Sequence, residues 1–214
     1  YLAKRETNRR LYIVIAGDRG LAGGYNANIL KAIEADAAGS DYCVLPIGKK
    51  AVEYFKRKNV TVITESYAEA ASVSIGDCYT IAKMLADGFL DGSFGKLTLG
   101  YTNFVSMLSQ TPSTLDLLPL RVSTEKRPSQ NTILYEPGSE AVFNAIVPEY
   151  LGGVLYGALC ESTASEQAAR RTAMDSATKN ADEIIDDLNL RYNRARQGAI
   201  TQEITEIVAG AEQS

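Results

Sequence analysis

The chain has 214 residues, of which 45 % are hydrophobic, and a formal net charge of −4. This apolar content is enough for one sizeable core, and the acidic balance argues against a general nucleic-acid-binding surface. The sequence contains no histidine, which excludes Ser/His and Cys/His nucleophile pairs and removes the commonest metal ligand. On the sequence as a whole we expect no catalytic residue, no metal and no cofactor.

The longest apolar-rich stretch, residues 150–160, is far shorter than the ~18 residues of a membrane span, so we expect none. The three cysteines, Cys43, Cys78 and Cys160, lack metal-binding spacing. We expect them to be reduced core thiols, which suits an intracellular compartment.

The first predicted elements are a strand, a tight turn and a helix. Residues 11–16 form a short, uniformly apolar run that is typical of a strand buried on both faces. The glycine-rich turn 17–24 follows, and residues 26–38 space their apolar side chains as a helix does. We interpret Asn26 as the cap of this helix.

The same alternation of strand and helix continues. Residues 42–47, 60–63 and 96–105 are predicted strands, and residues 49–58 and 75–90 are predicted helices. This order predicts an α/β fold with a doubly wound sheet.

Beyond Thr111 the pattern becomes loop-rich and is punctuated by prolines. It includes residues 115–122 and a short predicted strand at 132–135.

From Ser139 the chain reads as helix almost to its end. Ser139 can cap this helix, and Glu140 suits its first turn. Pro148 and the glycine pair at 152–153 are expected to bend or interrupt it. The domains are therefore predicted as 1–138, an α/β domain, and 139–214, a long C-terminal helix.

The helix beyond Gly157 is long for a chain of this size. Roughly 50 residues without proline would extend about 75–80 Å, whereas a compact domain of this size has a radius of gyration of ~15–17 Å. We therefore expect the helix to project from the domain or to wrap a partner.

An apolar stripe recurs along this helix with a mean step of ~3.7 residues, as one helical face requires. Much of it is alanine, which allows another helix to approach closely, and a partner helix is implied. Four further apolar residues make the tip more hydrophobic. The stripe is Ala177, Ala181, Ile184, Leu188, Tyr192, Ala195 and Ala199, and the tip residues are Ile200, Ile204, Ile207 and Val208.

The turn 17–24 could also be a dinucleotide site, because it lies between a strand and a helix. Its glycines do not follow G-x-G-x-x-G, and Asp18 would repel a phosphate, so a plain strand-to-helix turn is favoured.

The acidic segment 182–187 and the arginines Arg191, Arg194 and Arg196 are interpreted as solvated helix faces rather than as a metal or phosphate site.

Two segments resemble the gamma subunit of F-type ATP synthases. One is IAGDRGLAGGYN at 15–26. The other covers the long helix, as YGALCESTASEQAARRTAMDSATKNA at 156–181 and YNRARQGAITQEITEIV at 192–208. The resemblance covers the whole chain, more loosely between Ser40 and Gln130.

The resemblance implies a Rossmann-like foot domain and a C-terminal helix that forms half of an antiparallel coiled coil, the rotor shaft. It implies a non-catalytic central-stalk subunit that couples proton flow to ATP synthesis or hydrolysis by rotation. The implied partners are the alpha and beta subunits, the epsilon subunit and the c-ring, with no nucleic acid, and with the membrane only through the complex. The implied location is the cytoplasmic face of the bacterial plasma membrane, with an organellar inner membrane as the other possibility.

Individual residues carry over where the motifs match. Arg196, Gln197, Thr201 and Glu203 match the part of the shaft that contacts beta subunits. Tyr135 and Glu136 match the part of the foot that meets the c-ring and the epsilon subunit.

The family's first helix, on the order of 70 residues, is expected to precede Tyr1 and to be the partner of the stripe. The alternatives to the rotor are an α/β interaction module and a nucleotide-binding domain with a helical tail. Fragments could also pair through the stripe.

Overall fold

The computed structural model describes residues 1–3, 5–121 and 135–212. By its internal contacts the chain divides into two units, which we call unit 1 (Tyr1–Thr172) and unit 2 (Ala173–Ser214). The strand predicted at 132–135 lies outside the described residues except for Tyr135.

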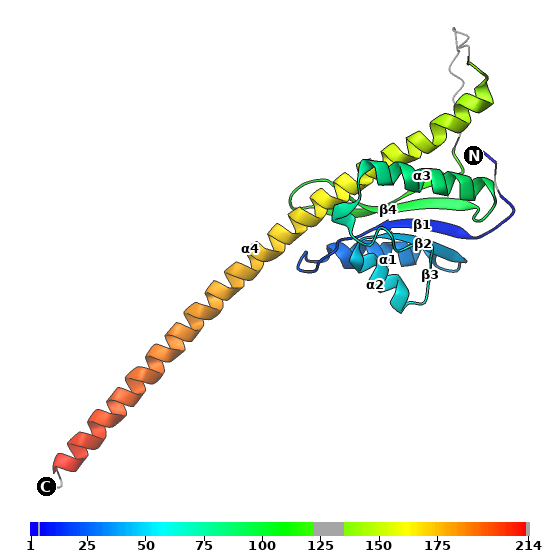
Figure 1. Cartoon of the computed structure of the whole chain (residues 1–214). Helices are drawn as coiled ribbons and strands as arrows, with labels where there is room; N and C mark the ends of the chain where they lie inside the picture. Colours follow the sequence, from blue (N-terminus) through cyan, green and yellow to red (C-terminus); the bar gives the residue numbers. More distant parts are fainter. Residues whose placement is uncertain (4, 122–134, 213–214) are drawn as a thin grey trace. The chain divides into compact units, whose positions relative to one another are not determined.

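Unit 1 is built on a mixed five-stranded sheet (Figure 1). The strand order is β3-β2-β1-β4-β5, in which the first four strands are parallel and β5 is antiparallel to β4. The strands are β1 (Arg10–Ile15), β2 (Tyr42–Ile47), β3 (Thr61–Val62), β4 (Lys96–Phe104) and β5 (Gln110–Leu118). The predicted strands at 11–16, 42–47, 60–63 and 96–105 are confirmed within a residue or two.

Alternate side chains of β1 enter two different cores, as the two-residue period of a strand requires. Leu11, Ile13 and Ile15 pack on one face with α3 (Ile75–Leu90) and α4 (Ser139–Glu212). Tyr12 and Val14 pack on the other face with α1 (Tyr25–Ala37) and α2 (Lys49–Arg57). Helices on both faces confirm the predicted doubly wound α/β sheet. A short 3-10 turn, η1 (Ala70–Ser72), precedes α3.

The strand β5 lies where a loop was predicted. Pro112 is opposite Thr102 in the β4–β5 pairing, at the open edge of the sheet. A proline has no N–H to donate, so it is tolerated where that position faces away from the ladder.

The helix α4 runs through Pro148 without interruption, so of the two predicted effects, a bend or an interruption, the interruption is wrong. Val147, Leu151 and Leu155 are buried in the core on either side of the proline, and this packing outweighs its local cost. Gly152 lets α4 approach α3 closely, because a Cβ there would lie 2.3 Å from Cδ1 of Tyr79.

The start of α4 also differs in detail from the prediction. Ser139, the predicted cap, is the first helical residue instead. The N–H of Val142 donates to the carbonyl of Gly138, the residue before Ser139. Glu140 lies in the first turn, as predicted.

The cysteines are all free thiols. Cys43 and Cys78 are buried, as predicted, whereas Cys160 is exposed on α4, so the prediction of a core thiol is wrong there. Burial raises the pKa of Cys43 and Cys78, the latter to about 11.

By length and composition, one helix among the described residues could cross a membrane. It is α4, whose most apolar 18-residue window has a mean hydropathy of 1.2. This differs from the expectation based on run length. The core helix of a soluble protein passes the same test, and 33 % of that window is buried.

Candidate partner-binding surfaces

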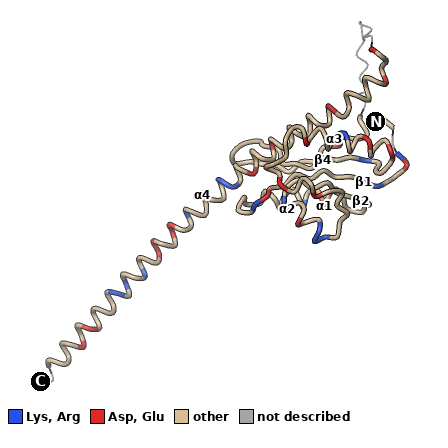
Figure 2. The backbone as a smooth tube through the Cα atoms, in the orientation of Figure 1, with Lys and Arg blue, Asp and Glu red and all other residues tan. Residues whose placement is uncertain are grey.

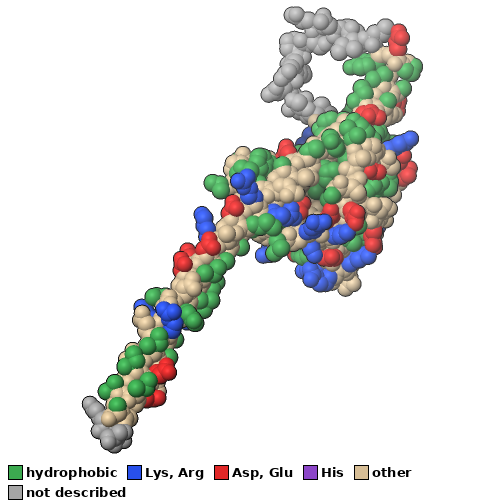
Figure 3. All heavy atoms as spheres, turned by 60° about the vertical axis from the view of Figure 1, so that its left-hand side comes forward, with side chains coloured by type: hydrophobic (Ala, Val, Ile, Leu, Met, Phe, Trp, Pro, Cys, Tyr) green, Lys and Arg blue, Asp and Glu red, His purple; other side chains and the backbone are tan. Residues whose placement is uncertain are grey.

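Unit 2 consists of the last forty residues of α4 that the structure describes, and their side chains are exposed from Met174 to Ala211. Charged residues recur along this helix (Figure 2). Hydrophobic side chains lie between them on its surface (Figure 3). A helix with this much exposed apolar surface is a candidate for binding a partner.

The seven-residue stripe lies on one face of unit 2. At 100° per residue its members fall within about 80° of the helix circumference. Ile184, Leu188 and Tyr192 are all exposed there. The seven residues of the stripe thus share one solvent-exposed face of the helix, and about half of them are alanines.

The apolar tip faces a different direction. On the same helical wheel the centre of Ile200, Ile204, Ile207 and Val208 lies about 145° from the centre of the stripe. All four residues are exposed. Unit 2 therefore has two separate apolar surfaces, which the sequence analysis did not distinguish.

The four polar residues predicted to contact beta subunits are exposed on the same helix. Arg196 and Glu203 lie about 20° apart on the wheel, and Gln197 and Thr201 lie about 40° apart on another side of the helix, about 130° from the first pair. The hydroxyl of Thr201 donates to the carbonyl of Gln197 at 2.9 Å, which leaves its oxygen able to accept from a partner. The two pairs do not form a single cluster.

The acidic and basic groups nearby behave as solvated helix faces. Arg191 pairs with Asp187 at 2.9 Å, one turn away. In the part of the chain that the structure describes, no group of three or more acidic, cysteine or histidine residues could hold a metal ion.

Tyr135 lines a second candidate surface, in unit 1. It borders an apolar hollow of about 410 Å³ together with Leu2, Phe143 and Ile146. Glu136 follows it and is exposed. Of the two predicted foot residues, Tyr135 thus lines an accessible apolar site next to the first turns of α4, whereas Glu136 is exposed beside it in the sequence without lining it.

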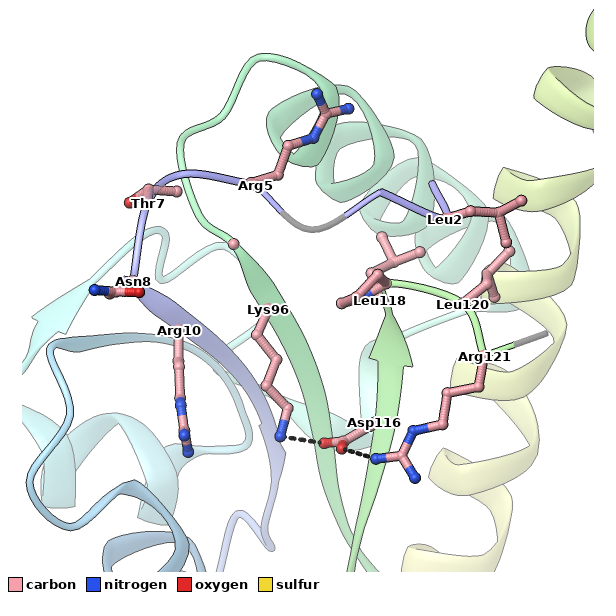
Figure 4. A pocket seen from close by; sticks show the side chains of 12 residues that line it. Leu2, Arg5, Thr7, Asn8, Arg10, Lys96, Asp116, Leu118, Leu120 and Arg121 are labelled. Carbon is pink, nitrogen blue, oxygen red and sulfur yellow. Dashed lines mark hydrogen bonds and ion pairs between the residues drawn. The ribbon is translucent and has the colours of Figure 1, made fainter. Parts of the chain in front are cut away.

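A larger cavity of about 470 Å³ lies at the amino ends of β1 and β4, lined by Arg10 and Lys96, the first residues of those strands. Lys96 and Arg121 both reach Asp116 on β5, at 2.8 and 2.9 Å (Figure 4). Burial raises the pKa of Asp116, but the hydrogen bonds from Lys96 and Thr98 outweigh it, so the pKa lies below its usual value. This cluster ties β5 to β4, and sequence reasoning missed it because it did not find β5.

Asp18 anchors the glycine-rich turn to two neighbouring segments. Asp18 accepts backbone N–H bonds from Lys49, at the start of α2, and from Ala70 and Ala71 of η1, at 2.9 to 3.2 Å. These donors belong to α2 and η1 rather than to α1, the helix that follows the turn, so Asp18 ties the turn to its neighbours. A carboxylate in this turn would repel a phosphate, which favours the plain turn over the dinucleotide site.

Asn26 does not cap α1, because Gly24 takes that position. Its amide instead binds the turn: Gly17 donates to Oδ1 at 2.8 Å, and Nδ2 donates to the carbonyl of Arg19 at 3.1 Å. The turn is therefore fixed from within.

Comparison with known proteins points in one direction. Residues 1–213 match the family described as ATP synthase. The ATP synthase gamma chain of Ruminococcus albus is 46 % identical over 212 residues, which cover 97 % of this chain and 74 % of that one. The gamma chain of Lachnoclostridium phytofermentans is 42 % identical over 222 residues, which cover 99 % of this chain and 76 % of that one. A gamma chain named as sodium ion specific, from Acetobacterium woodii, is 37 % identical over 232 residues, covering 99 % and 77 %.

Solved structures share the fold. A chain of the central stalk and c-ring structure of the Tetrahymena thermophila mitochondrial ATP synthase matches with a TM-score of 0.62 at 23 % identity, covering 82 % of this chain and 79 % of that one. A chain of the Euglena gracilis mitochondrial ATP synthase rotor matches with a TM-score of 0.67 at 17 % identity, covering 91 % of this chain and 76 % of that one.

Proposed function

Since the chain belongs to the ATP synthase gamma chain family, we propose that it is a rotor that couples proton flow through the membrane ring to ATP synthesis or hydrolysis in the alpha-beta catalytic head. Family membership makes it a non-catalytic central-stalk subunit. The observation that carries the proposal is the 46 % identity to a gamma chain over 97 % of this chain.

In this proposal the mechanism is mechanical and breaks no covalent bond. Each beta subunit samples open and closed states, and the shaft favours one of them through contacts that change with its rotary position. Arg196 and Glu203 supply charged contacts and Gln197 and Thr201 supply hydrogen bonds, all from exposed positions. Because the two pairs lie on different strips of the helix, a beta subunit meets a different chemistry as the helix turns.

The domains take the matching roles. Residues 1–138 are the foot and residues 139–214 the shaft, although by internal contacts the first part of α4 belongs to unit 1. Tyr135, at the apolar hollow, and the exposed Glu136 that follows it contact the c-ring and the epsilon subunit. The seven-residue stripe packs against a gamma chain's first helix as half of a coiled coil.

The complex lies on the cytoplasmic face of a bacterial plasma membrane, in keeping with the bacterial relatives. One relative is named for sodium, so ion use varies among relatives of this chain, and we assign the choice of ion to the ring rather than to this subunit.

The test is reassembly. The chain, extended by the first helix of a related gamma chain, is mixed with alpha and beta subunits, and ATP hydrolysis is measured. The double variant Arg196→Ala, Gln197→Ala should still assemble but lose activity severalfold, whereas Arg194→Ala should match the parent. Assembly without a loss would remove these two residues from the mechanism, and failure to assemble would count against the rotor itself.

A further inference from the structure

The turn between β4 and β5 presents apolar side chains to solvent. Leu108 is 87 % exposed, Val105 62 % and Met107 46 %. No charged residue occurs from Leu97 to Leu115, so the whole hairpin tip is uncharged. These neighbouring side chains form one exposed apolar patch, which makes the turn a candidate binding surface.

The turn is held in one conformation by hydrogen bonds. Val105 and Ser106 donate from their backbone N–H groups to the carbonyl of Ser109, at 3.2 and 3.0 Å. The amide of Gln110 donates to the carbonyls of Ser106 and Met107, at 2.9 and 2.8 Å. A turn ordered in advance loses little conformational entropy when it docks. The exposed side chains are therefore presented on a rigid support.

The hairpin tip and the Tyr135 hollow lie at opposite ends of β4. Leu2 lines that hollow and also the cavity beside Lys96, the first residue of β4, whereas the tip follows Phe104, its last. Nine strand residues separate the two ends by about 25–30 Å. One small partner bound at Tyr135 would not also cover the tip.

The size of the tip limits what can bind it. Full burial of such side chains removes on the order of 100 Å² each, so the three offer about 300 Å². A stable pair of proteins needs about 800 Å² from each partner. The tip is too small to hold a second copy of this chain by itself, and it fits an additional contact inside an assembly held elsewhere.

We propose that the β4–β5 hairpin tip is a second docking point on the catalytic head, seated on an uncharged apolar surface of an alpha or beta subunit. This rests on the function proposed above. Ser165 of α4 contacts Thr102 near the tip, seven residues before Thr172, the last residue of unit 1. Within unit 1, the tip thus lies close to the part of α4 that leads into the exposed length of the predicted shaft.

The first experiment is site-specific photo-cross-linking in the assembled complex. A photoreactive amino acid replaces Leu108 in one sample and Tyr135 in another. The proposal expects an adduct of position 108 with an alpha or beta subunit, while position 135 reports the c-ring and epsilon subunit. An adduct of position 108 with epsilon, the ring or a second copy would overturn it, as would a complex without any adduct. If no complex with alpha and beta forms in either sample, both this proposal and the rotor function fail.

The second experiment measures affinity for the alpha-beta head. The double variant Met107→Ser, Leu108→Ser should weaken binding roughly tenfold, because two apolar side chains lose their burial. The matched control is Met84→Ser, an exposed methionine of α3 that belongs to none of the proposed surfaces, which should leave the affinity for the head unchanged. The loss should also be the same at low and at physiological salt, because the contact is uncharged. Equal effects of both variants, or a loss that salt abolishes, would contradict the proposal.

Discussion

The hydroxyl of Ser162 on α4 accepts a hydrogen bond from the backbone N–H of Thr102 on β4, at 3.1 Å. One turn further along the helix, the hydroxyl of Ser165 donates to the carbonyl of the same threonine, at 3.2 Å. Thr102 lies two residues beyond Gly100, the last residue of β4 that pairs with β1. Two buried serines of a helix therefore take the place of a neighbouring strand.

Replacing these serines should destabilise unit 1. Ser162→Ala leaves the N–H of Thr102 buried without an acceptor, which costs about 1–3 kcal/mol. Chemical denaturation should show this as a lower midpoint. The control is Thr163→Ala, whose exposed hydroxyl bonds only back to Leu159 in its own helix. Equal midpoints for the two variants would mean that the helix does not depend on this contact.

Alanine substitutions at two adjacent glycines of α4 should change the stability of unit 1 in opposite directions. Gly152→Ala places a methyl group 2.3 Å from the Tyr79 ring, so we expect a loss of about 1–3 kcal/mol. Gly153→Ala meets nothing within 4 Å and should stabilise the helix by about 0.5–1 kcal/mol. Thermal unfolding of both variants tests the pair, and a gain at both positions would show that α3 simply moves aside.

Asp18→Ala should loosen the segment that contains η1. The carboxylate holds the N–H groups of Lys49, Ala70 and Ala71, so its loss should cost about 1–2 kcal/mol. Hydrogen exchange at residues 70 and 71 should accelerate. Asp41→Ala removes only a surface ion pair with Arg9 and should leave these amides unchanged. Unchanged exchange in the Asp18 variant would count against the capping role.

Tyr12 should make the stability of unit 1 depend on alkaline pH. Burial, followed by the hydrogen bond to Asp36 at 2.7 Å, raises the pKa of Tyr12 to about 12, against about 10 in the unfolded chain. The folded state thus favours the neutral phenol, so this contribution is complete below pH ~10 and is lost as the pH rises through ~12. Tyr12→Phe should remove a pH dependence on the order of 2 kcal/mol, measured by denaturation at several pH values. An equal pH dependence in the parent and in Tyr12→Phe would contradict this role of Tyr12.

Substitution of two exposed leucines of unit 2 should affect assembly differently, because only one of them belongs to the stripe. Leu188 is 57 % exposed and belongs to the stripe, whereas Leu190 is 50 % exposed and lies about 160° away from the stripe's centre on the helical wheel. If the stripe packs against another helix, Leu188→Ser should weaken assembly with the other subunits by about tenfold, and Leu190→Ser much less. Sedimentation of the assembled complex measures this. A larger loss at Leu190 would place the helix-pairing surface on the other side.

The sequence predicted the parallel part of the sheet because its strands are apolar on both faces, as in residues 11–16. It did not predict β5, whose Thr, Ser and Pro residues suit an open edge rather than a buried position. The interruption of α4 that was one of the two predicted effects of Pro148 does not occur, for a related reason: packing of Val147 and Leu151 against the core decides the local conformation, and local propensity does not include it.

The candidate surfaces were predictable to a different degree. The stripe follows from spacing alone, and the structure keeps its residues on one face. The Tyr135 hollow and the hairpin tip needed coordinates, because they join residues from distant parts of the chain or depend on the shape of a turn. No pattern in the sequence marks Gln110 as the residue that fixes the tip.

The two halves of α4 differ in what holds them helical. Starting a helix in water is unfavourable by about 4 kcal/mol for a nucleation constant near 10⁻³, whereas each added residue is nearly neutral. The buried segment up to Ala168 supplies that start, so the exposed residues only extend an existing helix. Their helicity should therefore decline gradually towards Glu212 rather than melt at one temperature. In the free chain the last turns would therefore be helical only part of the time. A partner that covers the stripe would make them fully helical, and part of its binding free energy would offset the cost of that ordering.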